Sequence, residues 1–144
     1  MAAPPKDADG YVEPHDDPQT IPDDSHVIRY IHTSQLVKCP DGTRRISSGA
    51  FSKSNKSKDR YEGMSVDMHE AMIAKGVDPE SRMPPDHEGA VVIQAAKLRE
   101  LGLEVGPDPT EDNPFHASVW GVKRSDRKKI KACCEWLIKP SDIE

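Results

Sequence analysis

Two short segments of the chain place a hydroxyl two residues after a histidine. The pairs are His32 with Ser34 and His116 with Ser118. In an extended segment these pairs point to one side, because side chains alternate along a strand. Neutral imidazoles suit general acid–base chemistry at a phosphodiester, since the ordinary pKa of histidine is about 6.5. The spacing therefore predicts a phosphate-handling site, with these four residues as the candidate catalytic groups.

The same motifs have a local resemblance to those of the two-histidine phosphoesterases. In that family one apolar residue separates the histidine from the hydroxyl and another follows it. The second segment, residues 116–119 (HASV), has this form, whereas residues 32–35 (HTSQ) are polar at both positions. The resemblance covers eight residues and implies a phosphodiester- or nucleotide-processing enzyme with His32 and His116 as its acid–base pair. The alternative is that both histidines pack or hydrogen-bond at strand ends without catalysis.

Arginines and serines near the first histidine are candidate ligand-binding residues. They are Arg29, Arg44, Arg45, Ser47 and Ser48. An arginine on an early strand, followed by a strand that carries serines, resembles the nucleotide-gripping elements of ADP-ribosyltransferases. That family also needs a glutamate on a late strand, and Glu104, the one acid in such a strand, has neighbours that do not match. We therefore expect these residues to contact a phosphate or carboxylate group without taking part in catalysis.

A longer part of the chain resembles a group of bacterial proteins of unassigned function. Four segments carry the resemblance: residues 29–32 (RYIH), 47–51 (SSGAF), 64–67 (MSVD) and 113–117 (NPFHA). The resemblance spans roughly residues 27–138. It implies a bacterial cytoplasmic protein with one domain, and it implies no activity.

Charge is unevenly distributed over the 144 residues, whose net charge is −5. Residues 1–25 contain seven acids against one lysine, whereas basic residues gather at 44–60 and 123–131. The basic clusters predict a surface that attracts anions, the alternative being two ordinary solvated faces. The acidic segment could also fold back on the basic clusters and screen them.

Composition also predicts the order and the compartment of the chain. Residues 1–24 combine prolines and acids with few large apolar side chains, which predicts a disordered acidic tail before a single globular domain at 25–144. The start of the chain lacks the hydrophobic core of a secretory signal, and no apolar run approaches the roughly 20 residues of a membrane span. Three cysteines, of which Cys133 and Cys134 are adjacent, suit a reduced cytoplasm better than a disulfide framework.

The apolar spacing predicts an α+β fold, a small mixed or antiparallel sheet with about three helices. Strands are expected at 27–31, 43–50, 103–105 and 115–122. Helices are expected at 65–75, 90–101 and 125–138, with Ser65 and Ser125 as caps. In the last strand, His116, Ser118 and Trp120 should share one face.

The sequence leaves two functional hypotheses. The first is a non-catalytic binding or interaction protein, such as an immunity, antitoxin or adaptor domain, whose partner is a protein or an anionic ligand (a nucleotide or nucleic acid). The second is the phosphodiester- or nucleotide-processing enzyme. No metal or cofactor is expected, because adjacent cysteines on a helix diverge and Gly102 and Gly106 lack the spacing of a phosphate-binding loop.

Overall fold

The computed structural model describes residues 3–143. Eight strands occur in this range: β1 (His26–His32), β2 (Leu36–Lys38), β3 (Arg44–Ile46), β4 (Met64–Met68), β5 (His87–Gln94), β6 (Glu104–Pro107), β7 (His116–Trp120) and β8 (Glu135–Ile138). The helices are α1 (His69–Ala74), α2 (Ala95–Glu100) and α3 (Arg127–Cys133). None of these helices is long and apolar enough to span a bilayer.

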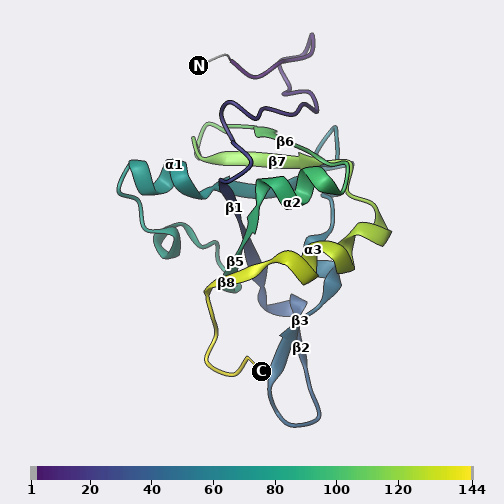
Figure 1. Cartoon of the computed structure of the whole chain (residues 1–144), viewed down its shortest axis with the longest axis vertical. Coiled ribbons are helices and arrows are strands. Elements are labelled where there is room, and N and C mark those ends of the chain that lie inside the picture. Colours follow the sequence, from purple (N-terminus) through teal and green to yellow (C-terminus); the bar gives the residue numbers. More distant parts are fainter. Residues whose placement is uncertain (1–2, 144) are drawn as a thin grey trace.

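Six strands form one twisted sheet in the order β6-β7-β4-β1-β5-β8, and β2 pairs with β3 in a separate hairpin (Figure 1). All pairings between these strands are antiparallel. The predicted α+β fold is therefore confirmed, and of its two expected sheet types the antiparallel one is observed.

Alternation along the strands divides the apolar side chains between the two faces of the sheet. Val27 and Ile31 of β1 belong to the larger core, which also contains Leu98 of α2 and Ile130 of α3. Ile28, between them, belongs to a second cluster on the opposite face, with Met72 of α1, Ala90 and Phe115. Two helices thus pack on one face and α1 on the other. Figure 1 shows α1 on the opposite side of β1 from α2 and α3.

Each predicted helix overlaps a strand at one of its ends, which corrects its expected bounds. The segment 64–68 is β4, since Met64 and Val66 are buried at a spacing of two, and the helix begins only at His69. Likewise β5 occupies 87–94 before α2, and β8 follows α3 at 135–138. Short runs of apolar residues fit both periods, and pairing with β1 and β7 selects the extended form here.

Residues 3–24 make defined contacts with the rest of the chain, so the predicted disordered tail is not supported. The segment follows the free edge of β6: Asp17 N–H donates to the Val105 carbonyl (3.0 Å), and Val105 N–H donates to the Asp16 carboxylate (3.0 Å). Ile21 is only 2% exposed and belongs to the larger core. This covering pairs backbone groups that an open edge strand would leave free. Residues 1, 2 and 144 lie outside the described residues.

The acids of this segment meet cations of the folded body, which explains why a composition poor in apolar residues still becomes ordered. Arg99 of α2 bridges Asp16 and Asp23, both at 2.8 Å. Asp7 accepts hydrogen bonds from the Tyr61 hydroxyl (2.6 Å) and from Arg60 (2.8 Å). The contact with Tyr61 is the main cause that lowers the pKa of Asp7 to about 2. Charge–charge contacts thus supplement the small apolar area of the segment.

Candidate functional site

The central strands β1 and β4 separate soon after they pair. Backbone pairing joins Val27 with Met68 and Ile28 with Asp67, and the next residue of β1, Arg29, has no paired partner on β4. Its guanidinium lies between the two strands instead: Nη1 donates to the Ser65 carbonyl (2.8 Å), and Nε donates to the Ala50 carbonyl (2.9 Å). The side chain thus satisfies a carbonyl that the sheet leaves without a ladder partner.

A cavity of about 190 Å³ opens where these strands diverge. Its lining comes from β1, β4, the start of β7 with the loop before it, and the segment 82–87. It comprises Arg29, Tyr30, Ser65, Val66, Asp67, Arg82, Pro84, His87, Asn113 and His116. We call it the β1–β4 cavity. It joins guanidinium, imidazole, hydroxyl and amide groups, all of which can donate hydrogen bonds to an anion.

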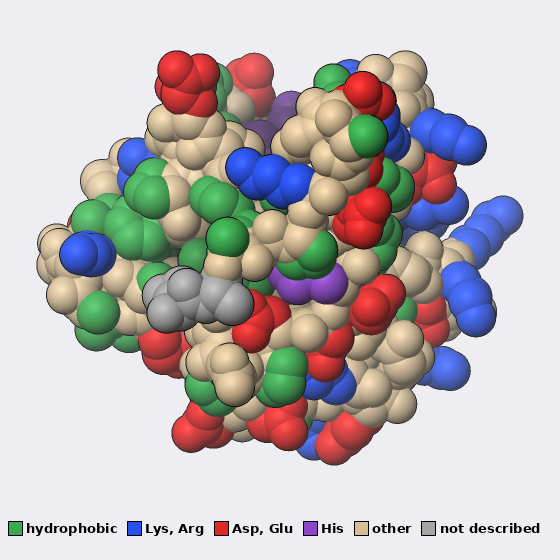
Figure 2. Space-filling view, turned by 90° about the horizontal axis from the view of Figure 1, so that it is seen from above, with side chains coloured by type: hydrophobic (Ala, Val, Ile, Leu, Met, Phe, Trp, Pro, Cys, Tyr) green, Lys and Arg blue, Asp and Glu red, His purple; other side chains and the backbone are tan. Residues whose placement is uncertain are grey.

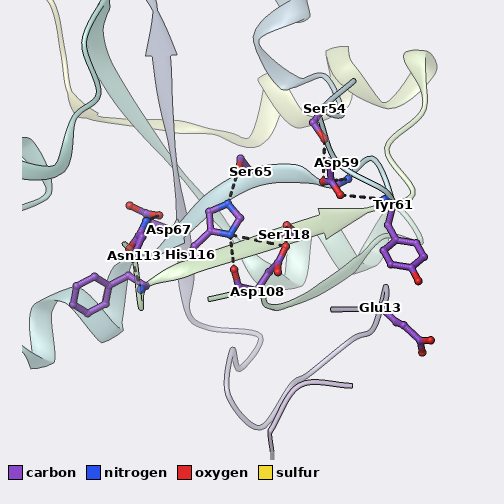
Figure 3. A network of polar contacts seen from close by, with 12 residues as sticks. Glu13, Ser54, Asp59, Tyr61, Ser65, Asp67, Asp108, Asn113, His116 and Ser118 are labelled. Carbon is purple, nitrogen blue, oxygen red and sulfur yellow. Dashed lines mark hydrogen bonds and ion pairs between the residues drawn. The ribbon is translucent and has the colours of Figure 1, made fainter. Parts of the chain in front are cut away.

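A serine and a histidine on adjacent strands form the shortest side-chain contact of this cavity. Ser65 of β4 lies 2.5 Å from His116 Nε2, while His116 Nδ1 lies 2.6 Å from the carbonyl oxygen of Asp108 (Figure 3). A carbonyl only accepts, so Nδ1 carries the proton; in the neutral ring Nε2 then accepts from the Ser65 hydroxyl. The carboxylate of Asp108 is held by the Ser118 hydroxyl at 2.8 Å.

Strand register explains why these residues meet. Asp67 of β4 stands opposite His116 of β7, and Ser65 stands opposite Ser118. Residues two apart on paired strands share a face, so all four side chains lie on the face away from the larger core. Asp67 is buried and accepts a hydrogen bond from the Asn113 amide at 2.8 Å.

The charges of the cavity are unbalanced toward the cationic side. Arg29 and Arg82 form no ion pair with any described residue, and Asp67 is the one carboxylate in the lining. Burial lowers the pKa of the Arg29 guanidinium to about 10. Burial and the nearby Asp67 raise the pKa of Tyr30, whose hydroxyl donates to the Pro79 carbonyl at 2.8 Å.

Of the four candidate catalytic residues, His116 alone lines this cavity. His32 does not; its Nδ1 contacts the Ser34 hydroxyl (2.8 Å), and its ring packs edge-on against His87 with centroids 5.1 Å apart. The second histidine in the lining is His87. Ser118 is buried and contacts Asp108, as described above.

The candidate ligand-binding residues are dispersed. Arg29 lines the β1–β4 cavity, whereas Arg44 bridges Glu88 (2.9 Å) and Asp142 (2.6 Å) and ties the end of the chain to β3. The Ser47 hydroxyl accepts from the Gly49 amide and caps the short turn Ser48–Phe51.

The two basic clusters of the sequence meet at a second, shallow cavity of about 390 Å³. We call it the basic hollow; its lining is Arg45, Ser48, Lys128, Lys131 and Ala132. The turn Ser48–Phe51 packs against α3 through Ala50, Phe51 and Ile130, which belong to one core. This packing brings Arg45 beside α3.

The sequence did not predict several residues of the β1–β4 cavity as site residues, above all Ser65, Asp67, Arg82 and His87. The pattern at 64–75 favoured a helix capped by Ser65. A spacing of two over Met64–Met68 would have placed Ser65 and Asp67 on one polar face, so a signal was present. Arg82 and His87 flank two prolines, and their meeting with β1 depends on tertiary structure.

Comparison with known proteins adds no relative. No family model, curated protein or solved structure matches the chain significantly. Residues 3–143 contain no group of three or more histidine, cysteine or acidic side chains placed to hold a metal ion. The function must therefore be inferred from the contacts of the site itself.

Proposed function

We propose that this protein binds a small anionic ligand with a phosphate group in the β1–β4 cavity. The observation that carries the proposal is the environment of Arg29, a partly buried guanidinium with no carboxylate partner among residues 3–143. Removing a cation from water is costly unless an opposite charge compensates it. A phosphate fits the planar donor fork of arginine, and a nucleotide is one such ligand.

Three other arginines show how Arg29 differs from a cation with a structural role. Arg44, Arg60 and Arg99 each bridge two carboxylates, as expected of cations that stabilise a fold. Arg82, by contrast, donates to the Asp112 carbonyl at 3.1 Å and lines the same cavity as Arg29. A ligand anion would supply the charge that both guanidinium groups lack.

Calorimetric titration with inorganic phosphate and with adenosine 5′-monophosphate tests the proposal. Replacing Arg29 by Met should weaken binding about tenfold or more, because a hydrogen bond to a charged group contributes about 1.5–3 kcal/mol. Arg124→Met is the matched control, since it removes the same charge from an exposed position outside the cavity. If Arg29→Met does not fold, Arg82→Met provides the same comparison.

Saturable binding that only the cavity variants weaken would support the proposal. Absence of binding to both ligands, or equal weakening by Arg124→Met, would contradict it.

The proposal includes a reducing compartment such as the cytoplasm, which suits the three free cysteines of the chain.

A further inference from the structure

The Ser65–His116 contact has the arrangement of an activated nucleophile. Ser65 is exposed on β4 and its hydroxyl donates to His116 Nε2 at 2.5 Å, within reach of proton transfer. The Asp108 carbonyl accepts from His116 Nδ1 and so fixes the tautomer in which Nε2 is free to take a proton. Asp108 thus acts as a positioning residue, and its carboxylate is itself held by Ser118.

The cations of the cavity indicate which reaction this pair suits. Arg29 Nη1 donates to the backbone carbonyl of Ser65, so its guanidinium lies next to the residue that carries the nucleophile, in the same cavity. Arginine clamps stabilise the charge on a phosphoryl group in transfer, whereas acyl transfer commonly uses backbone amides as an oxyanion hole. Charge therefore favours attack at phosphorus.

We propose that Ser65 and His116 hydrolyse a phosphate monoester held in the β1–β4 cavity, through a phosphoserine intermediate. This inference rests on the proposed anion site. Unlike the two-histidine scheme, it needs one histidine and a serine nucleophile.

The reaction takes two steps. Ser65 Oγ attacks phosphorus while its proton passes to His116 Nε2; the bond from phosphorus to the alcohol oxygen breaks, and the leaving alkoxide takes the proton from His116. Water then attacks the phosphoserine and gives a proton to His116. Ser65 Oγ leaves phosphorus and recovers that proton, so the products are an alcohol and inorganic phosphate.

Turnover of p-nitrophenyl phosphate, followed by the absorbance of nitrophenolate, tests the inference. Ser65→Ala and His116→Ala should each lower the rate about 10²–10⁴-fold, the usual cost of removing such a group. Ser65→Thr keeps a hydroxyl and suits a strand, so it should retain measurable turnover. Ser57→Ala, in an exposed loop, is the control and should match the unaltered protein.

A second readout does not depend on recognition of the leaving group. A fluorophosphate reagent should label Ser65 of the folded protein, as identified by peptide mass spectrometry, and His116→Ala should abolish the label. Circular dichroism verifies that each variant is folded.

The outcomes separate this inference from the proposed function. Phosphate binding without turnover or labelling would overturn the catalytic inference and leave the anion site intact. Absence of phosphate binding to the unaltered protein would contradict the anion site. An equal loss of turnover in His32→Ala would also overturn the inference, because His32 lies outside the cavity lining and would then act as in the two-histidine scheme.

Discussion

Arg29 has different partners from Arg44 and Arg99. Arg44 and Arg99 bridge carboxylates that are distant in sequence, and they fix the two ends of the described chain to its centre. Arg29 contacts only carbonyl oxygens, at the point where β1 and β4 separate. The first kind of contact stabilises structure, whereas the second leaves a positive charge facing a cavity. This difference between single residues is the basis of the proposed anion site.

Close packing at Gly106 gives a prediction at the same scale. A Cβ at this position would lie 2.5 Å from His15 Nε2, so Gly106→Ala forces the His15 ring to shift and disturbs its packing against Trp120, whose ring centroid is 5.1 Å away. We expect a loss of about 1–3 kcal/mol in the free energy of unfolding, measured with urea, because overpacking a fitted contact costs that much.

Two further variants sharpen this measurement. Gly49→Ala is the control, since its Cβ would meet nothing nearer than 3.5 Å and the substitution should be nearly neutral. Adding His15→Ala to Gly106→Ala should recover part of the lost stability. An unchanged unfolding midpoint for Gly106→Ala alone would show that His15 does not rest on Gly106 in solution.

Among the larger elements, the N-terminal segment 3–24 acts as an extension of the sheet. Its backbone and the Asp16 carboxylate satisfy both backbone groups of Val105 in the edge strand β6. In Figure 1 the segment runs along the β6 side of the sheet, which would otherwise end in an open edge. Covering an edge in this way prevents pairing with another chain.

Ile21 is the apolar anchor of that segment and provides its test. Ile21→Ala should lower the free energy of unfolding by about 2–5 kcal/mol, the usual cost of truncating a buried aliphatic side chain. Ile73→Ala is the matched control, because Ile73 is 60% exposed on α1. Chemical denaturation followed by tryptophan fluorescence measures both. Equal and small effects would mean that the segment does not dock, as its composition alone predicts.

The molecule as a whole separates its charges more than its net charge of −5 implies. In the view of Figure 2, several lysines and arginines project from the right-hand edge, whereas acidic side chains occur at the top and in the lower half. The acids of the N-terminal segment pair with Arg60 and Arg99 and leave the basic hollow uncovered by these contacts. Among residues 3–143, ion pairs between the N-terminal acids and the basic clusters therefore occur only at Arg60.

The basic hollow should therefore attract polyanions. Fluorescence anisotropy with a short single-stranded oligonucleotide should detect binding that weakens as salt is added. The logarithm of the binding constant should fall with the logarithm of the salt concentration, with a slope of roughly 0.7 per phosphate contact. Lys128→Glu should reduce both the affinity and the slope, whereas Lys75→Glu, the same charge change beyond α1, should alter neither substantially. Equal effects of the two variants would mean that the net charge of the protein, and not the basic hollow, attracts the oligonucleotide.

Local patterning determined much of this structure. The β-branched run at 27–31 and the alternation at 115–122 predicted β1 and β7, and Trp120 is buried on the face expected to carry His116 and Ser118. The first was predictable from its β-branched and aromatic composition, and the second from the alternation of its side chains. The polar face of β7 is the part of the candidate site that follows from the sequence.

Tertiary structure decided the remainder. The runs at 64–68 and 87–94 fit a helix or a strand, and only their antiparallel neighbours select the strand. The contact of Ser65 with His116, 51 residues away, depends on the register of β4 against β7, and the position of Arg29 depends on where β1 and β4 part. Local periodicity contains neither kind of information, because strand pairing joins residues that are far apart in the chain.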